Sequence, residues 1–101
     1  MSVNQVRERD VEHYLVAALD KIRIPCLKFD PSGKIGMPDR IIPIPGGKVI
    51  WVEMKKPSGG RLSEVQKLRH AELRKLGQDV RVVWSKEEAD QIVEEIRNLG
   101  Q

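Results

Sequence analysis

The 101-residue sequence contains a single cysteine, Cys26, and two histidines, His13 and His70, which lie far apart in the chain. One cysteine excludes an intrachain disulfide and fits a reducing compartment. These three residues match no zinc-ligand spacing, so zinc fingers and redox-active disulfide scaffolds are excluded. No apolar run approaches the roughly 18 residues that a membrane helix requires, and the polar N-terminus lacks the apolar segment of a signal peptide. The sequence therefore predicts a cytoplasmic protein without a membrane segment.

Aromatic residues are also scarce, at 4%, whereas 40% of the residues are hydrophobic and 33% are charged. This composition is typical of a small folded domain and not of a disordered chain. We expect residues 1–101 to form a single domain with a thin core, and a core this thin favours a dimer. Trp51, Trp84 and Cys26 are expected in that core, and both histidines at the surface.

The net charge of +3 is small, but it is unevenly distributed along the chain. Seven basic and two acidic residues lie between positions 54 and 76, whereas two basic and five acidic residues lie between positions 85 and 101. Such asymmetry is typical of a face that meets an anionic partner. Two ordinary solvated helices would produce the same pattern, so the charge alone does not decide between these interpretations.

Three helices are predicted from the spacing of apolar residues and from capping residues. Apolar positions recur every three or four residues over 8–22 and again after Ser85. Ser63 and Gln66 form a capping-box pattern at the start of the middle helix, which we expect to end at Gly77. Ser85 and Glu88 repeat the capping-box pattern at the start of the last helix.

Four strands are predicted at residues 26–29, 40–44, 48–55 and 80–84, where β-branched and apolar residues are concentrated between turn residues. Together with the helices they give the order αβββαβα. The fold class is therefore mixed α/β, with helices packed on a small central mixed sheet.

The two middle strands form a hairpin around Pro45-Gly46-Gly47, and its register decides where Asp39 lies. A three-residue loop places Ile44 opposite Lys48 and, by the same register, Asp39 opposite Glu53. A two-residue loop would turn Asp39 to the other face, because a shift of one residue reverses every side chain. We adopt the three-residue loop.

In this register Asp39, Glu53 and Lys55 converge, because residues two apart on a strand share a face. Two opposed carboxylates destabilise a sheet unless their charge is neutralised, and a hard divalent cation would neutralise both. The alternative is structural: Asp39 would cap the turn after Pro38, and Glu53 and Lys55 would form a solvated ion pair.

The order Pro38-Asp39, a spacer and Glu53-Met54-Lys55 resembles the PD-(D/E)XK signature of the restriction-endonuclease-like superfamily. The neighbouring segments resemble more specifically the VRR-NUC (virus-type replication-repair nuclease) family. Those segments are Arg9-Asp10-Val11-Glu12, Gly36-Met37-Pro38-Asp39-Arg40-Ile41, Trp51-Val52-Glu53-Met54-Lys55 and Leu62-Ser63-Glu64-Val65-Gln66. The resemblance extends from about Val6 to Trp84 and implies a restriction-endonuclease-like core.

The resemblance implies a metal-dependent endonuclease that cuts DNA. Asp39, Glu53 and the backbone carbonyl of Met54 would bind Mg²⁺ or Mn²⁺, and Glu12 would contact the metal through water. Gln66 would lie beside the site. Lys55 would orient or deprotonate the attacking water; we favour a role in positioning and charge stabilisation, because two neighbouring carboxylates would keep it protonated.

Glu12 and Gln66 each have a simpler interpretation, as a partner of Arg9 and as the capping-box residue of Ser63. Four basic residues in or beside the loops around the site are candidates for sequence-independent phosphate contacts: Lys34, Arg40, Lys56 and Arg61.

The resemblance further implies structure-directed cleavage of branched or four-way-junction DNA by a homodimer. Partner proteins in replication or repair are not identified by the sequence. Two other classes remain: a non-catalytic nucleic-acid-binding or partner module on the same fold, and a small scaffold or regulatory dimer.

Overall fold

The computed structural model describes residues 5–30 and 32–100, and its elements follow the predicted order αβββαβα. Three helices and four strands alternate in the same sequence as predicted, with ends that differ from the prediction by one or two residues. Their bounds are α1 (Glu8–Lys21), β1 (Leu27–Lys28), β2 (Arg40–Ile44), β3 (Lys48–Met54), α2 (Glu64–Lys75), β4 (Asp79–Val83) and α3 (Lys86–Leu99). In the described part of the chain, no helix has the length and apolar character needed to cross a membrane.

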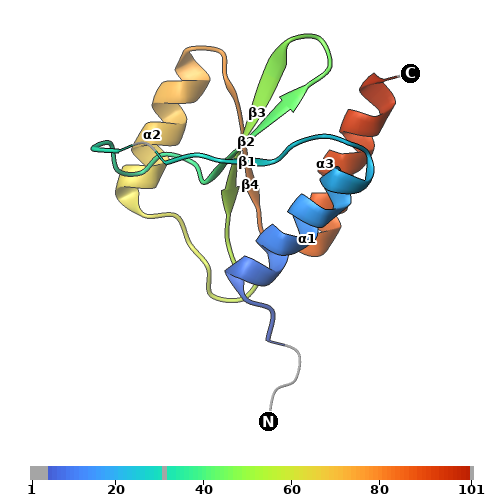
Figure 1. The fold of residues 1–101 in the computed structure, drawn as a ribbon. Coiled ribbons are helices and arrows are strands. Elements are labelled where there is room, and N and C mark those ends of the chain that lie inside the picture. Colours follow the sequence, from blue (N-terminus) through green and yellow to red (C-terminus); the bar gives the residue numbers. More distant parts are fainter. Residues whose placement is uncertain (1–4, 31, 101) are drawn as a thin grey trace.

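The four strands form one mixed sheet in the order β1-β2-β3-β4. The pairs β1–β2 and β2–β3 are antiparallel, whereas β3 and β4 are parallel and are connected through α2. Figure 1 shows the sheet nearly edge-on, with α2 on one side and α1 and α3 on the other. The predicted mixed α/β fold is therefore confirmed.

The hairpin has the predicted three-residue loop, because Ile44 pairs with Lys48 and Arg40 pairs with Val52. Side chains alternate between the faces of a strand, so this register assigns a face to every residue of β2 and β3. Arg40 and Val52 lie on the side of α1 and α3. Glu53, the next residue after Val52, lies on the side of α2.

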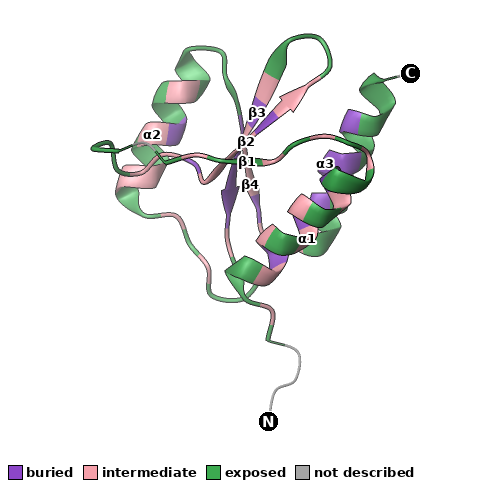
Figure 2. Cartoon of the chain, viewed as in Figure 1, coloured by how far each residue is buried: buried purple, intermediate pink, exposed green. Residues whose placement is uncertain are grey.

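The apolar core lies between the sheet and the pair α1 and α3. Its members are fully or almost fully buried: Val11, Leu15, Leu19, Ile42, Ile50, Val52, Met54, Val83, Ala89, Ile92, Val93 and Ile96. Figure 2 shows the buried positions along the strands and on the inward sides of these two helices. Cys26 packs at the margin of this core, and burial raises the pKa of its thiol to about 11.

The α2 side of the sheet is more polar. His70 is the buried residue of α2, at 1% exposure, so the prediction of a surface histidine was wrong at this position. His13 is exposed, as predicted. Trp51 and Trp84 are half-buried and lie outside the core cluster, which corrects their predicted placement.

The capping predictions were correct at α2 and partly wrong at α3. The N–H of Ser63 donates to Oε1 of Gln66 at 2.9 Å, and the N–H of Gln66 donates to Oγ of Ser63 at 3.1 Å. At α3, Ser85 accepts from the N–H of Glu88, but the Glu88 carboxylate accepts from Trp84, one residue before the expected donor.

Gly36 allows the loop before Asp39 to approach α2 closely. Its φ of +87° lies in the left-handed region, and an added Cβ would be 2.7 Å from the carbonyl oxygen of Val65. The Arg69 side chain fixes the same contact, because its Nε donates to the Ile35 carbonyl at 3.1 Å. Only glycine meets both the conformational and the steric requirement here.

Replacing Gly36 with alanine is therefore expected to destabilise the protein more than the same change at Gly77. Gly77 has a similar φ of +84°, but nothing lies within 4 Å of its added Cβ. Gly77→Ala should cost about 1–2 kcal/mol from conformational strain alone, whereas Gly36→Ala should cost roughly 2–5 kcal/mol because overpacking is added. Urea unfolding of both variants measures the difference, and equal losses would contradict the close approach.

Candidate active site

Asp39 immediately precedes β2, at the end of the sheet where β3 finishes. Its N–H donates to the Val52 carbonyl at 3.0 Å, although Val52 already lies opposite Arg40. Two residues of one strand thus oppose a single residue of the other, which is the pattern of a β-bulge. In this position the Asp39 carboxylate accepts a hydrogen bond from the backbone N–H of Met54, and the distance from Oδ2 to the nitrogen is 2.8 Å.

Glu53 is a buried carboxylate beside Asp39. It is 1% exposed, and its pKa is raised to about 8. Burial is the largest cause; the charge of Asp39 and a hydrogen bond with it come next, and the nearby Lys55 opposes them. Nζ of Lys55 lies 4.0 Å from Oε2 of Glu53. The bulge displaces Asp39 from its predicted position opposite Glu53, but Asp39, Glu53 and Lys55 still lie together as predicted.

Gln66 makes contacts of both kinds considered for it, with Ser63 and with Glu53. Its side-chain oxygen completes the capping box with Ser63, while its Nε2 donates to Oε2 of Glu53 at 3.1 Å. Because the cap fixes the oxygen of the amide, the nitrogen is directed at the carboxylate.

His70 is a site residue that the sequence analysis missed. Its Nε2 lies 3.3 Å from Oε1 of Glu53, so Gln66 and His70, one helical turn apart on α2, contact the two oxygens of one carboxylate. Burial lowers the pKa of His70, which favours the neutral ring with Nε2 as donor. Nδ1 is buried and has no partner in the described residues. The spacing of four residues from Gln66 was the signal that could have identified it.

Glu12 and Arg40 are placed differently from the prediction. Nε of Arg40 lies 2.8 Å from Oε2 of Glu12, and NH1 donates to the Cys26 carbonyl at 2.9 Å. The two side chains are 16% and 19% exposed. Arg40 lies on the face of β2 opposite the α2 side, and its guanidinium joins α1 to the sheet.

Glu8 is the acidic residue of α1 whose charge is coupled to the site. Its pKa is raised by burial first and then by the charge of Asp39, while Lys55 opposes the shift. Glu8 lies one turn before Glu12 on the same side of the helix. The family resemblance implied a role for Glu12. Glu8 is four residues earlier on the same side of α1, and this spacing could have predicted that Glu8 lies near the site.

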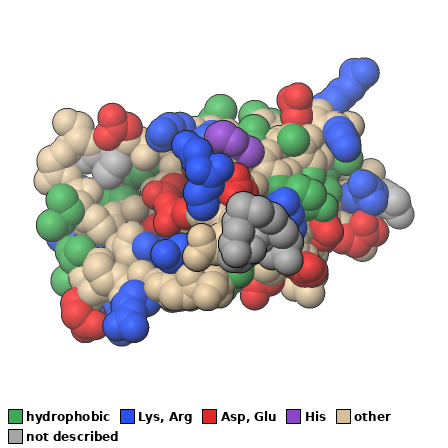
Figure 3. Space-filling model, turned by 90° about the horizontal axis from the view of Figure 1, so that it is seen from below, with side chains coloured by type: hydrophobic (Ala, Val, Ile, Leu, Met, Phe, Trp, Pro, Cys, Tyr) green, Lys and Arg blue, Asp and Glu red, His purple; other side chains and the backbone are tan. Residues whose placement is uncertain are grey.

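Basic residues surround the acidic cluster at this end of the molecule. Lys34, Lys56 and Arg61 are exposed. Figure 3, which views this end from below, shows acidic side chains in the middle of the face with lysine and arginine beside them. This distribution suits an anionic partner.

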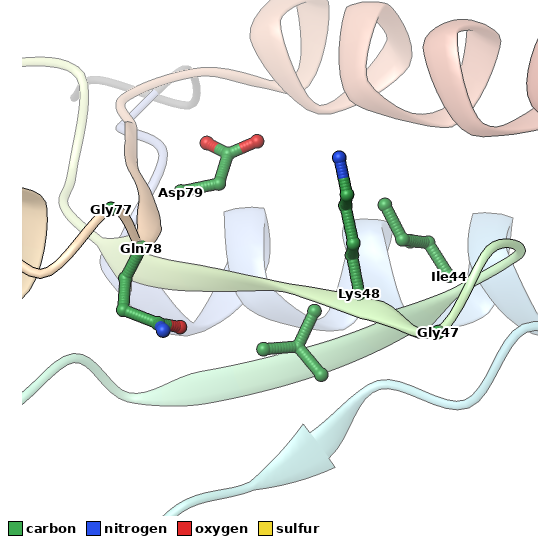
Figure 4. A pocket seen from close by; sticks show the side chains of 7 residues that line it. Ile44, Gly47, Lys48, Gly77, Gln78 and Asp79 are labelled. Atoms are coloured by element: carbon green, nitrogen blue, oxygen red, sulfur yellow. The ribbon is translucent and has the colours of Figure 1, made fainter.

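A hollow of about 450 Å³ lies at the other end of the sheet, lined by Ile44, Gly47, Lys48, Val49, Gly77, Gln78 and Asp79. In Figure 4 the side chains of Lys48 and Asp79 extend toward the ribbon of α3, while Gln78 points the other way. Lys48 begins β3 and precedes Glu53 by five residues, so Lys48 lies about 17 Å from Glu53 at the rise of a β-strand. The hollow therefore takes no part in the carboxylate site.

The donor set at the carboxylate site fits a hard divalent cation. Asp39 and Glu53 present adjacent carboxylate oxygens, and the pKa of Glu53 is raised first by burial and then by the charge of Asp39. Among residues 5–30 and 32–100, no three His, Cys, Asp or Glu side chains are grouped to hold a metal ion. Mg²⁺ commonly binds one or two carboxylates and completes its coordination shell with other oxygens, so a pair of carboxylates suits it.

Comparison with known proteins agrees with this arrangement. No family model matches the sequence. A relative named "Putative nuclease p44", from Acyrthosiphon pisum secondary endosymbiont phage 1, is 39% identical over 82 residues, which cover 81% of this chain and 87% of the relative. A solved structure described as "VRR_NUC domain" superposes with a TM-score of 0.78 at 29% identity, covering 86% of this chain and 94% of the other.

The chain belongs to the VRR-NUC family. The solved VRR-NUC structure matches this mixed α/β fold over 86% of the chain. The family resemblance inferred from the sequence motifs is thereby confirmed, together with the fold class.

The buried carboxylate of Glu53 should make the stability of the metal-free protein, measured in EDTA, depend on pH. Glu53 holds a proton in the folded state up to about pH 8, whereas its ordinary pKa is 4.5. Between these values the folded state binds more protons than the unfolded state, so the free energy of unfolding falls as the pH rises. From pH 6.5 to 8.5 we expect a loss of roughly 2 kcal/mol.

Glu53→Gln should remove this pH dependence, since glutamine keeps the shape and does not titrate. Urea unfolding at several pH values measures both proteins. An equally steep dependence in Glu53→Gln would show that another group causes it.

Proposed function

We propose that this VRR-NUC protein is a metal-dependent endonuclease that hydrolyses phosphodiester bonds in DNA. The observation that carries the proposal is the convergence of Asp39, Glu53 and Lys55 at one end of the sheet. The relative is named as a nuclease, and the basic rim residues suit a polyanion. Glu53 is unusually buried for a carboxylate, which is typical of a functional site and not of a solvated ion pair.

Asp39, Glu53 and the carbonyl of Met54 would hold Mg²⁺, and Mn²⁺ would substitute. When bound, the metal lowers the pKa of a water molecule and stabilises charge on the phosphate. Gln66 and His70 orient Glu53 through its two oxygens, and the Met54 N–H orients Asp39. Both carboxylates are thus fixed before a metal arrives, which limits the reorganisation needed for binding.

Lys55 would position the attacking water and stabilise the charge that develops on the phosphate oxygens. Its side chain is 14% exposed and extends from the same face as Glu53. We assign to Glu8 the water-mediated contact that the family resemblance had assigned to Glu12, because Glu8 is coupled to Asp39 and Lys55. Glu12 then acts indirectly, by fixing α1 to the sheet through Arg40.

Cleavage assays test the proposal with single-stranded, duplex, flap and four-way-junction DNA in Mg²⁺, Mn²⁺ or EDTA. Asp39→Asn and Lys55→Met should each reduce the cleavage rate at least about 100-fold, since the first removes a carboxylate that would hold the metal and the second removes a cation that stabilises charge on the phosphate. Lys55→Met should still bind metal, which calorimetry measures. Lys48→Met, at the exposed start of the same strand, is the matched control and should cut like wild type.

Metal-dependent cutting that survives Asp39→Asn would contradict the assigned site. DNA binding without cutting in any metal would instead support a non-catalytic nucleic-acid-binding module.

We further propose that the nuclease acts as a homodimer on branched DNA, including four-way junctions. A 101-residue chain offers little surface for a duplex, and a two-fold dimer presents two sites to a nearly symmetric substrate. Exposed apolar side chains are available for association, among them Leu76 and Leu99 at 77% and 53% exposure.

Light scattering after gel filtration should give twice the chain mass, and a four-way junction should be cut in two opposing strands. A monomer that cuts all substrates at equal rates would contradict both parts.

A further inference from the structure

Trp84 lies next to Lys55 on the neighbouring strand. The parallel pair β3–β4 places Met54 beside Val83, and the ladder continues with the N–H of Lys55 donating to the Val83 carbonyl at 3.0 Å. Residues in register on parallel strands point to the same face. Trp84, which follows Val83, therefore shares the α2 side of the sheet with Lys55 and Glu53.

The Trp84 side chain lines a groove of about 420 Å³ together with Arg61, Leu62, Glu64 and Lys67. The other lining residues come from the loop before α2 and from its first turns. Arg61 and Lys67 are exposed cations, and Lys67 pairs with Glu64 at 3.1 Å. A groove lined by an aromatic residue and two cations has the chemistry of a nucleotide-binding groove.

Trp51 provides a contrast within the same molecule. Its Nε1 donates to Gln78 at 2.8 Å, and its ring packs edge-on against Phe29 at 5.1 Å between centroids. Trp84 is fixed through its backbone, because its N–H donates to Glu88 at 2.6 Å. In the part of the chain that the structure describes, no comparable partner holds the Trp84 ring. Trp51 therefore has a structural role, whereas Trp84 lines a groove.

We infer that Trp84 is a stacking platform for an unpaired nucleobase next to the phosphate that is cut, with Arg61 and Lys67 contacting the flanking phosphates. This inference rests on the proposed nuclease function. Stacking on an aromatic ring does not depend on base identity, but the base must be free of its duplex neighbours. The groove therefore selects DNA with unpaired nucleotides at the cut, such as a flap or branch point, over continuous duplex.

Tryptophan fluorescence tests the contact directly, since the chain has two tryptophans. In Trp51→Phe the signal comes from Trp84 alone, and in Trp84→Phe from Trp51 alone. Oligothymidylate in EDTA should quench the first variant strongly and the second weakly, because stacked bases quench an indole. Equal quenching in both variants, or none while fluorescence anisotropy of labelled DNA reports binding, would overturn the inference.

Binding and cleavage provide the second test. Trp84→Ala should weaken binding to flap DNA roughly five- to hundredfold, because one base-stacking contact is lost. Trp84→Phe should restore most of it, and binding to blunt duplex should change much less. Arg61→Ala should instead weaken binding to every substrate and reduce the salt dependence by about one charge.

The outcomes separate the inference from the function on which it rests. If wild type cuts flap DNA and Trp84→Ala binds and cuts it unchanged, the stacking platform is wrong and the nuclease stands. If wild type neither binds nor cuts any DNA, both are wrong. If Trp84→Ala is stably folded but loses binding to flap and duplex DNA equally, the groove does not select unpaired bases and the inference is wrong.

Discussion

The buried carboxylate of Glu53 is the constraint on which the α2 side of the sheet depends. A carboxylate at 1% exposure has lost its water, so it must receive hydrogen bonds from the protein. Gln66 and His70 supply one to each oxygen. This requirement explains why α2 buries a histidine against the sheet where an ordinary packing helix would bury an apolar side chain.

The two faces of the sheet consequently have different functions. The face toward α1 and α3 carries the apolar core and most of the packing stability. The face toward α2 carries the buried polar residues Glu53 and His70, and Gly36 brings the loop before Asp39 against the same helix. Asp39, Glu53 and α2 thus form one assembly, while the ends of β3 and β4 place Lys55 and Trp84 side by side.

The main differences between the predicted and observed site arise from contacts between distant segments. Arg40 is next to Asp39 in the sequence, but its side chain faces α1 and forms an ion pair with Glu12. His70 was expected at the surface because a polar residue on a charged helix is normally solvated. It becomes interior only through a carboxylate on a strand 17 residues earlier. The spacing of four residues places His70 on the same helical face as Gln66, but it does not show that this face packs against Glu53.

The sequence by itself determined the order of elements, the hairpin loop, the capping box of Ser63 and the motif residues of the VRR-NUC family. These features depend on local periodicity and turn chemistry, which are determined by residues close together in the sequence. Only the tertiary structure decided that the charge of Asp39 acts on Glu8 while Glu12 pairs with Arg40, that His70 contacts Glu53, and that Trp84 lines a groove. Each of these depends on burial and on the charges of distant segments, which exist only after the sheet and helices have packed.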